Sequence, residues 1–130
     1  MVTGSWDATL KIWDNNTREV TATLRGNKDW INGVAITLDG KYVASGATDS
    51  SVKLFEVESG EMKWSAMHAA WVTCVAFDSK SKLLASGSGD TLINIWNVEN
   101  GSKLKELKGH AKTVQVVKFS PDGKLLASAG

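Results

Sequence analysis

One stretch decides the fold of this chain: GSGDTLINIWN, residues 87–97. It recurs with variations as GATDSSVKLFE at 46–56 and as GSWDATLKIWD at 4–14, and a fourth copy begins at 127–130. The aspartates of the three copies, Asp7, Asp49 and Asp90, follow one another at intervals of 42 and 41 residues. A fixed period of this length is typical of stacked supersecondary units and argues against a fold built around a single core.

Within each period the apolar residues alternate with a period of two, which indicates strands. Val75 and Phe77 alternate with small residues, and the pairs Asp39-Gly40 and Asp122-Gly123 supply the positive φ angles of tight turns. One period therefore holds four strands, which we expect at 72–77, 83–88, 92–97 and 104–107. No helical apolar stripe is present, so the sequence predicts an all-β chain with almost no helix.

Counting these strands divides the chain into units. Residues 1–25 hold the third and fourth strands of a first unit, at 9–14 and 20–24. Residues 27–66 and 68–108 each hold a full unit, and residues 110–130 hold the first and second strands of a last unit, at 114–119 and 125–129. We therefore expect twelve strands, arranged as half a unit, two full units and half a unit.

Units of this length that end in Gly109-His110 and in Ile12-Trp13-Asp14 resemble the WD-repeat (transducin-beta-like) family of β-propellers, and the resemblance covers the whole chain. The resemblance implies four-stranded blades around a central channel and a role as a platform for protein interactions. Propellers hold about four to eight blades, so three do not readily close a ring. Two alternatives stay open. We favour a segment of a longer propeller, because Met1 leads directly into the middle of a blade; the other is a self-assembling half-propeller, two copies of which form a six-bladed ring.

One set of residues in the third unit has the types of a catalytic triad. The family resemblance places His68 before the first strand, Ser86 on the second, Asp90 in the next turn and Trp96 on the third. Triads are recognised by their geometry and not by residue types alone. We interpret the set as a structural hydrogen-bond network, because a buried imidazole needs a donor and an acceptor. We therefore expect no enzyme, no cofactor and no metal site, and a hydrolase that uses His68, Ser86 and Asp90 is a distant alternative.

The other units vary this set. In the second unit Asn27 stands at the histidine position and Phe55 at the tryptophan position, while Ser45 and Asp49 are retained. We expect a weaker or rearranged network there, and a smaller contribution of Asp49 than of Asp90 to stability. The two ends of the chain hold complementary halves of one further set: Asp7 and Trp13 at the start, and His110 and Ser128 at the end.

Three tryptophans are expected at one end of the propeller. Antiparallel strands place the loop before the first strand and the turn between the second and third strands at the same end. Trp30 and Trp71 precede first strands 41 residues apart, and Trp6 precedes the turn aspartate Asp7. Exposed tryptophan is a common interface anchor. With the positions that the resemblance adds, the predicted partner-binding residues are Trp6, Trp30, Asn32, Thr48, Trp71, Thr73 and Gln115. For Trp64, packing between blades and exposure to solvent both remain open.

Composition narrows the classes of partner. With a net charge of +1 and a pI near 7.8, the chain lacks the excess of positive charge that is typical of proteins that bind nucleic acid or an anionic membrane. Cys74 is the only cysteine, which excludes an intrachain disulfide. No apolar run of membrane length and no signal peptide are present. We therefore expect an intracellular protein, cytoplasmic or nuclear, that serves as a non-catalytic scaffold for a protein or peptide partner, with a second copy or further blades as other partners.

Overall fold

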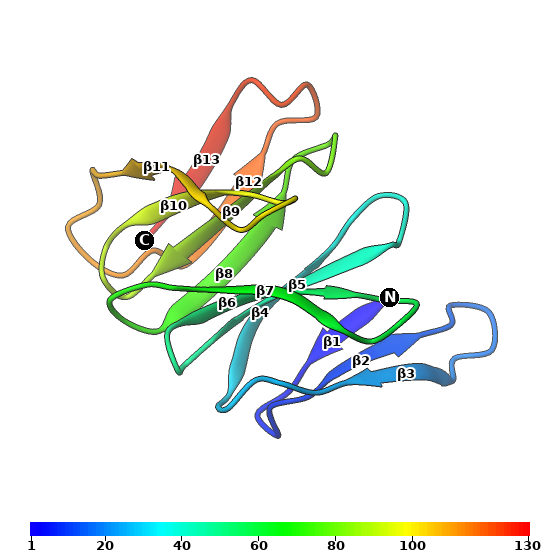
Figure 1. Ribbon diagram of the computed structural model, residues 1–130. Helices are drawn as coiled ribbons and strands as arrows, with labels where there is room; N and C mark the ends of the chain where they lie inside the picture. The colour runs from blue at the N-terminus through cyan, green and yellow to red at the C-terminus, as the bar shows by residue number, and fades with distance from the viewer.

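The computed structural model describes residues 1–130 and contains thirteen strands and no helix, which confirms the all-β prediction (Figure 1). The strands form four antiparallel sheets, with the orders β1-β2-β3, β4-β5-β6-β7, β11-β10-β9-β8 and β12-β13. These are called the first to fourth sheets. Their strands are β1 (Val2–Gly4), β2 (Leu10–Trp13), β3 (Val20–Leu24), β4 (Ile31–Ile36), β5 (Tyr42–Ala47), β6 (Ser51–Glu56), β7 (Met62–Met67), β8 (Val72–Phe77), β9 (Leu83–Ser88), β10 (Ile93–Asn97), β11 (Lys103–Leu107), β12 (Val116–Phe119) and β13 (Leu126–Ala129).

The first sheet has one strand more than the sequence predicts. Two strands were expected in residues 1–25, but β1 pairs with β2 in an antiparallel ladder that runs from Val2 opposite Ile12 to Gly4 opposite Leu10. A strand of three residues is too short to show an alternating pattern, and its backbone pairing with β2 defines it instead. The first sheet therefore lacks only the first strand of a full unit.

The sheets follow one another in chain order, from the blue first sheet to the red strand of the fourth sheet (Figure 1). The first strands of the second, third and fourth sheets, β4, β8 and β12, lie side by side, and β1 contacts β4. The order of the strands in both four-stranded sheets puts β7 and β11 at the edges away from this row. Each complete sheet therefore runs outward from a shared inner row of strands, as the blade of a propeller does.

The apolar core is divided into three clusters, each between two successive sheets. The cluster between the second and third sheets is centred on Leu54, Val72 and Leu84, all of them buried. Corresponding clusters join the first to the second sheet and the third to the fourth sheet. Burial of apolar surface stabilises a protein in proportion to the area removed from water. Each sheet therefore depends on its neighbours for its core.

A repeated glycine lets successive sheets come close together. A Cβ atom on Gly46 would lie 2.4 Å from Val72 Cγ1 of the next sheet. In the next repeat, a Cβ atom on Gly87 would lie 2.7 Å from Val114 Cγ1. Both distances are shorter than a carbon–carbon contact allows. A side chain at these positions would therefore push two sheets apart.

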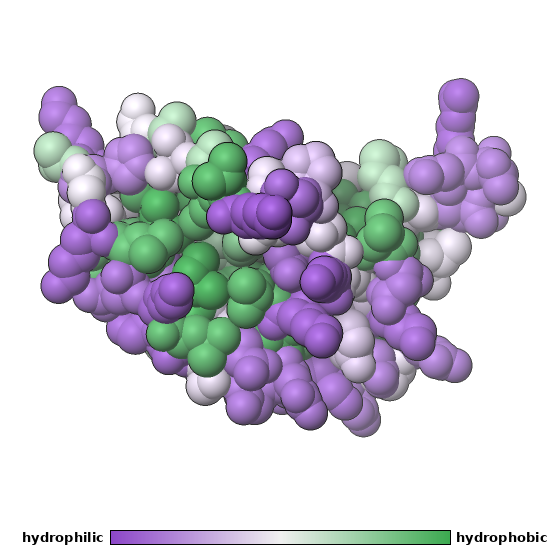
Figure 2. Space-filling model, turned by 90° about the horizontal axis from the view of Figure 1, so that it is seen from above, coloured by the Kyte–Doolittle hydropathy of each residue, from purple (hydrophilic) through white to green (hydrophobic).

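The surface is mostly hydrophilic, but apolar side chains reach it near the middle of the view in Figure 2. Large apolar side chains with exposure above one third include Ile36, Leu38, Val116 and Leu125. No helix of the structure has the length and apolarity needed to span a bilayer.

Candidate functional site

The four residues of the third-unit set form one chain of hydrogen bonds. His68, just after β7, places Nδ1 2.9 Å from Asp90 Oδ2 and Nε2 2.7 Å from Ser86 Oγ. Trp96 Nε1 donates to Ser86 Oγ over 2.7 Å. A carboxylate only accepts, so Nδ1 carries the ring proton and Nε2 accepts from the Ser86 hydroxyl. The Ser86 hydroxyl group thus donates to His68 and accepts from Trp96 within this network.

Burial determines the charge state of this set. It lowers the pKa of His68 below its ordinary value, although the hydrogen bond to Asp90 acts in the opposite direction. For Asp90, burial acts to raise the pKa, but hydrogen bonds from the Leu92 N–H and from His68 outweigh it and hold the pKa below its usual range. The ring is therefore neutral and the carboxylate ionised near neutral pH.

The second sheet holds a different network at the same place. Ser45 Oγ donates to Asn27 Oδ1 over 3.1 Å, and the aromatic ring of Phe55 offers Ser45 no donor. Lys53, which is buried on β6, donates to Ser51 Oγ over 3.0 Å and lies 3.5 Å from Asp49 Oδ2. The expectation that Asp49 contributes less than Asp90 does not fit this geometry, because Asp49 is the counterion of a buried ammonium group. Sequence reasoning missed Lys53, although it stands four residues after the turn aspartate, where the third unit has Asn94.

The two end halves of the set are not brought together. His110 Nε2 lies 2.7 Å from Ser128 Oγ in the fourth sheet, whereas Trp13 Nε1 donates to Thr3 Oγ1 over 2.8 Å in the first sheet. Asp7 accepts hydrogen bonds from the backbone N–H and the hydroxyl of Thr9. Thr3 on β1 therefore fills the position that Ser86 holds in the third unit, and the sequence prediction missed it together with its strand.

Two of the three predicted surface tryptophans form a stacked pair. Trp6, in the turn between β1 and β2, is 72% exposed, and Trp30, just before β4, is 49% exposed. Their ring centroids lie 4.9 Å apart with an angle of 18° between the planes. The pair joins the first sheet to the second and offers a flat aromatic surface to solvent.

Trp71, just before β8, is 48% exposed and lies over Gly89 of its own sheet. A Cβ atom on Gly89 would come within 2.5 Å of the indole, so the missing side chain makes room for the ring. Backbone hydrogen bonds from Thr48 to Trp30 and from Gly89 to Trp71 put both tryptophans beside turns between second and third strands. The end of the molecule that carries Trp6, Trp30 and Trp71 is called the tryptophan face.

Asn32 and Thr73, two polar residues predicted for partner binding, are engaged within the molecule. Asn32 Nδ2 donates to Val72 O over 2.9 Å, and Thr73 Oγ1 donates to Val114 O. Each bond joins a first strand to the start of the next sheet. Thr48 Oγ1 accepts a second bond from Asn32. The side chain of Gln115, at the equivalent position before β12, is exposed.

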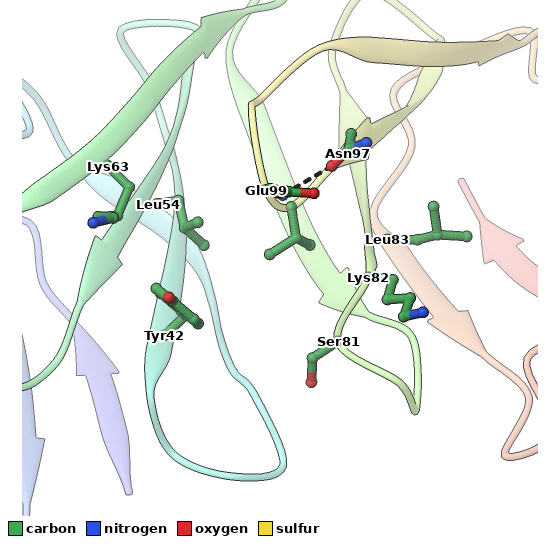
Figure 3. Close-up of a pocket in the computed structure, with 9 residues that line it drawn as sticks. Tyr42, Leu54, Lys63, Ser81, Lys82, Leu83, Asn97 and Glu99 are labelled. Atoms are coloured by element: carbon green, nitrogen blue, oxygen red, sulfur yellow. Dashed lines mark hydrogen bonds between the residues drawn. The ribbon is translucent and has the colours of Figure 1, made fainter.

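The structure assigns Trp64 to a contact between sheets. Its indole Nε1 donates to Val98 O over 2.7 Å, and its ring lies against Gly101. Nearby, a groove of about 600 Å³ opens between the second and third sheets. Figure 3 shows Tyr42 and Lys63 on one side of it and Lys82, Asn97 and Glu99 on the other. No local sequence pattern predicts this groove, because it lies between two units.

The chain matches the family model described as WD domain, G-beta repeat, over residues 1–14, 18–56, 64–97 and 101–130. It is 33% identical over 125 residues to WD repeat-containing protein SL1-17 of Schistosoma mansoni. The matched residues are 96% of the chain and 42% of that relative. Small ribosomal subunit protein RACK1y of Oryza sativa subsp. japonica is 34% identical over 62 residues, or 48% of the chain and 18% of the relative. Protein transport protein sec13 of Aspergillus clavatus is 37% identical over 73 residues, or 50% of the chain and 25% of the relative.

The chain thus spans less than half the length of each of these relatives. The four matched segments together cover most of the chain. They are offset from the sheets by one strand: segment 18–56 holds β3 of the first sheet with β4, β5 and β6 of the second, and segment 101–130 holds β11 of the third sheet with β12 and β13 of the fourth. On this evidence the chain belongs to the WD-repeat family.

Proposed function

We propose that this chain is a non-catalytic interaction segment that binds a protein or peptide on the tryptophan face. Proteins of this family generally act as protein-interaction scaffolds. Two of the relatives are named for the small ribosomal subunit and for protein transport. Because these roles differ, we propose only the binding surface and the chemical class of the partner, which is a polypeptide. An intracellular place, cytoplasmic or nuclear, fits the same names.

The stacked and exposed pair Trp6–Trp30 carries the proposal. Tryptophan is enriched among residues that dominate binding energy, because it buries a large area with little loss of conformational freedom. The pair is preformed by its stacking, so a partner does not have to order it. Trp71 adds a third exposed indole on the same face. Together the three rings provide both apolar area and faces on which a cationic side chain can rest.

The alternative of a hydrolase lacks support. Ser86 is fully buried, and its hydroxyl lies between His68 Nε2 and Trp96 Nε1. A serine nucleophile has to approach a substrate carbonyl with its base beside it. No substrate can reach this hydroxyl without opening the core, so the set serves to hold the turn.

Selection of peptides from a random library on the folded chain tests the proposal. Peptides that bind the wild-type protein are then measured on Trp6→Ala and Trp30→Ala, with affinity expected to fall about 30-fold or more, as loss of about 2 kcal/mol implies. Met62→Ala is the matched control, because Met62 is 47% exposed and lies on the outer strand β7. Peptides that bind both tryptophan variants as tightly as the wild type would refute the proposed face.

A further inference from the structure

The groove between the second and third sheets has no role in the function proposed above. Its lining residues all lie between residues 42 and 99, in the two complete sheets, and its volume is about 600 Å³. Ligand pockets in proteins commonly have volumes of about 300–1,000 Å³. Lys82, between first and second strands, and Glu99, between third and fourth strands, both line it. The groove therefore lies at the end of the molecule opposite the tryptophan face.

The most buried residues that line the groove are apolar. Leu54 on β6 and Val98, just after β10, are buried, and Leu83 on β9 is half-buried. Tyr42, which is also half-buried, lies on the same wall as Leu54 (Figure 3). Apolar and aromatic side chains of this kind favour an apolar group of a ligand. The lumen of the groove is therefore suited to one large apolar side chain of a partner.

Hydrogen bonds hold the walls of the groove in place. The Val98 N–H donates to Lys82 O over 3.1 Å. Asp78 Oδ1 accepts from the N–H groups of Lys82 and Leu83. Trp64 Nε1 donates to Val98 O over 2.7 Å and so ties the second sheet to the third. Because the walls are already ordered, a ligand that enters the groove loses little binding energy to their ordering.

Three charged side chains at the rim of the groove take part in no ion pair of the structure. Lys63 lies on one wall, and Lys82 and Glu99 lie on the other (Figure 3). All three are exposed, whereas the two lysines beside Glu106 are paired with its carboxylate. In Figure 3 the amino groups of Lys63 and Lys82 point away from the space between the walls. The two cations therefore flank the apolar lumen on either side and leave it open.

We propose that this groove binds an extended peptide in which one large apolar side chain is flanked on both sides by acidic residues. The apolar side chain enters the lumen and contacts Leu54 and Val98, while the acidic side chains pair with Lys63 on one wall and Lys82 on the other. An extended chain fits this arrangement because it places carboxylates on both sides of the apolar anchor, whereas a small organic anion carries its charge at one place. Complementary charges of this kind favour one class of partner over others.

Glu99 opposes the acidic flank of such a peptide. It lies on the same wall as Lys82, and Asn97 Oδ1 fixes its main chain by accepting from its N–H over 2.8 Å. Like charges repel one another, so this carboxylate weakens the binding of acidic residues at the rim. Glu99→Gln therefore strengthens binding of the proposed peptide, whereas it would weaken binding of a peptide with basic flanks. The sign of this change distinguishes the two kinds of peptide.

Two series of labelled peptides test the chemistry of the ligand. The acidic series is Gly-Glu-Asp-X-Asp-Glu-Gly, with every natural residue in turn at X, and the neutral series has Gln and Asn in place of Glu and Asp. Fluorescence anisotropy measures binding to the full chain. Acidic peptides with Phe or Leu at X are expected to bind about tenfold more tightly than acidic peptides with Ser at X or than neutral peptides. An acidic series that does not bind, or equal binding by the two series, would overturn the proposal.

Variants of the chain test the site. Lys63→Gln and Lys82→Gln are each expected to weaken binding about threefold, as loss of one exposed ion pair implies, and Glu99→Gln is expected to strengthen it by about the same factor. Lys105→Gln is the matched control, because Lys105 is exposed on β11 and lies outside the groove. All four side chains are exposed, so the fold is retained. Unchanged binding in both groove-lysine variants, or equal weakening by Lys105→Gln, would contradict the proposed site.

A measurement on Trp30→Ala separates the groove from the tryptophan face. Trp30 lies just before β4, at the opposite end of the molecule, so the acidic peptides are expected to bind this variant as tightly as the wild type. Weaker binding to Trp30→Ala would assign these peptides to the tryptophan face and overturn the groove as their site. Failure of the acidic peptides to bind, in turn, leaves the proposed function of the tryptophan face unaffected.

Discussion

Lys53 is a buried cation on β6, with its ammonium group 3.5 Å from Asp49 Oδ2 and 3.0 Å from Ser51 Oγ. Asn27, which accepts a hydrogen bond from Ser45 of the second sheet, is also buried, and its Nδ2 has no hydrogen-bond partner. The third sheet has a neutral histidine network at the same place. In the third sheet the turn aspartate accepts from a neutral imidazole, whereas in the second sheet it forms an ion pair with an ammonium group, so the two aspartates have different tasks.

Asp49→Ala is expected to destabilise the chain more than Asp90→Ala. Removal of Asp49 leaves the Lys53 ammonium group buried without its counterion, which costs about 3 kcal/mol or more. Removal of Asp90 leaves the neutral imidazole N–H and the backbone N–H groups of Ala69 and Leu92 without an acceptor, at about 1–3 kcal/mol. Urea midpoints measure both. Lys53→Met in the Asp49→Ala background is expected to restore most of the loss, and a smaller loss for Asp49→Ala than for Asp90→Ala would contradict the ion-pair account.

Acidification is expected to weaken the third-sheet network. Burial lowers the pKa of folded His68 below its ordinary value of about 6.5, so the neutral ring stabilises the fold above that pH. This contribution is lost as the pH falls from about 6.5 through the folded pKa. The free energy of unfolding, measured between pH 8 and pH 5, should therefore decrease, and His68→Asn should show a smaller decrease. A wild-type chain that becomes more stable on acidification through this window would contradict the account.

At the scale of elements, close packing between sheets depends on glycine in the second strand. Gly87 faces Val114 Cγ1 and Cys74 Sγ, each 2.7 Å from the place of its missing Cβ. Gly87→Val is therefore expected to cost about 1–3 kcal/mol, because overpacking forces strands apart. Gly109→Val is the control, since nothing lies within 4 Å of a Cβ there. Denaturant midpoints compare the two, and equal midpoints would show that the third and fourth sheets do not depend on this contact.

The elements that the sequence predicts well are those with a repeated local pattern. Strands such as β8 and β9 follow from alternation and from the turns that separate them. β1 could not be predicted, because three residues carry no period and only its pairing with β2 defines it. The partners of Trp64 and Trp6 lie in neighbouring units, so no local pattern reports them. The sequence thus predicts units better than it predicts contacts between units.

At the scale of the whole molecule, the repeat brings side chains of separate sheets to one end. Trp6 and Trp30 come from different sheets. They meet there because the turn between the second and third strands and the loop before the first strand lie at the same end of every sheet. Asn32 and Thr73, predicted for the same surface, instead bind the next sheet. The polar residues of this end therefore hold the sheets in place, while the exposed indoles remain available to a partner.

The central claim is that these indoles are a binding surface, and protection from an aqueous quencher tests it most directly. Acrylamide quenching of tryptophan fluorescence is measured with the free chain and with a peptide selected on it. Trp6, Trp30 and Trp71 are exposed, whereas Trp96 is buried, so the free chain should show a large accessible fraction. The account predicts that the bound peptide removes most of that fraction. A peptide that binds tightly and leaves the accessible fraction unchanged would contradict it.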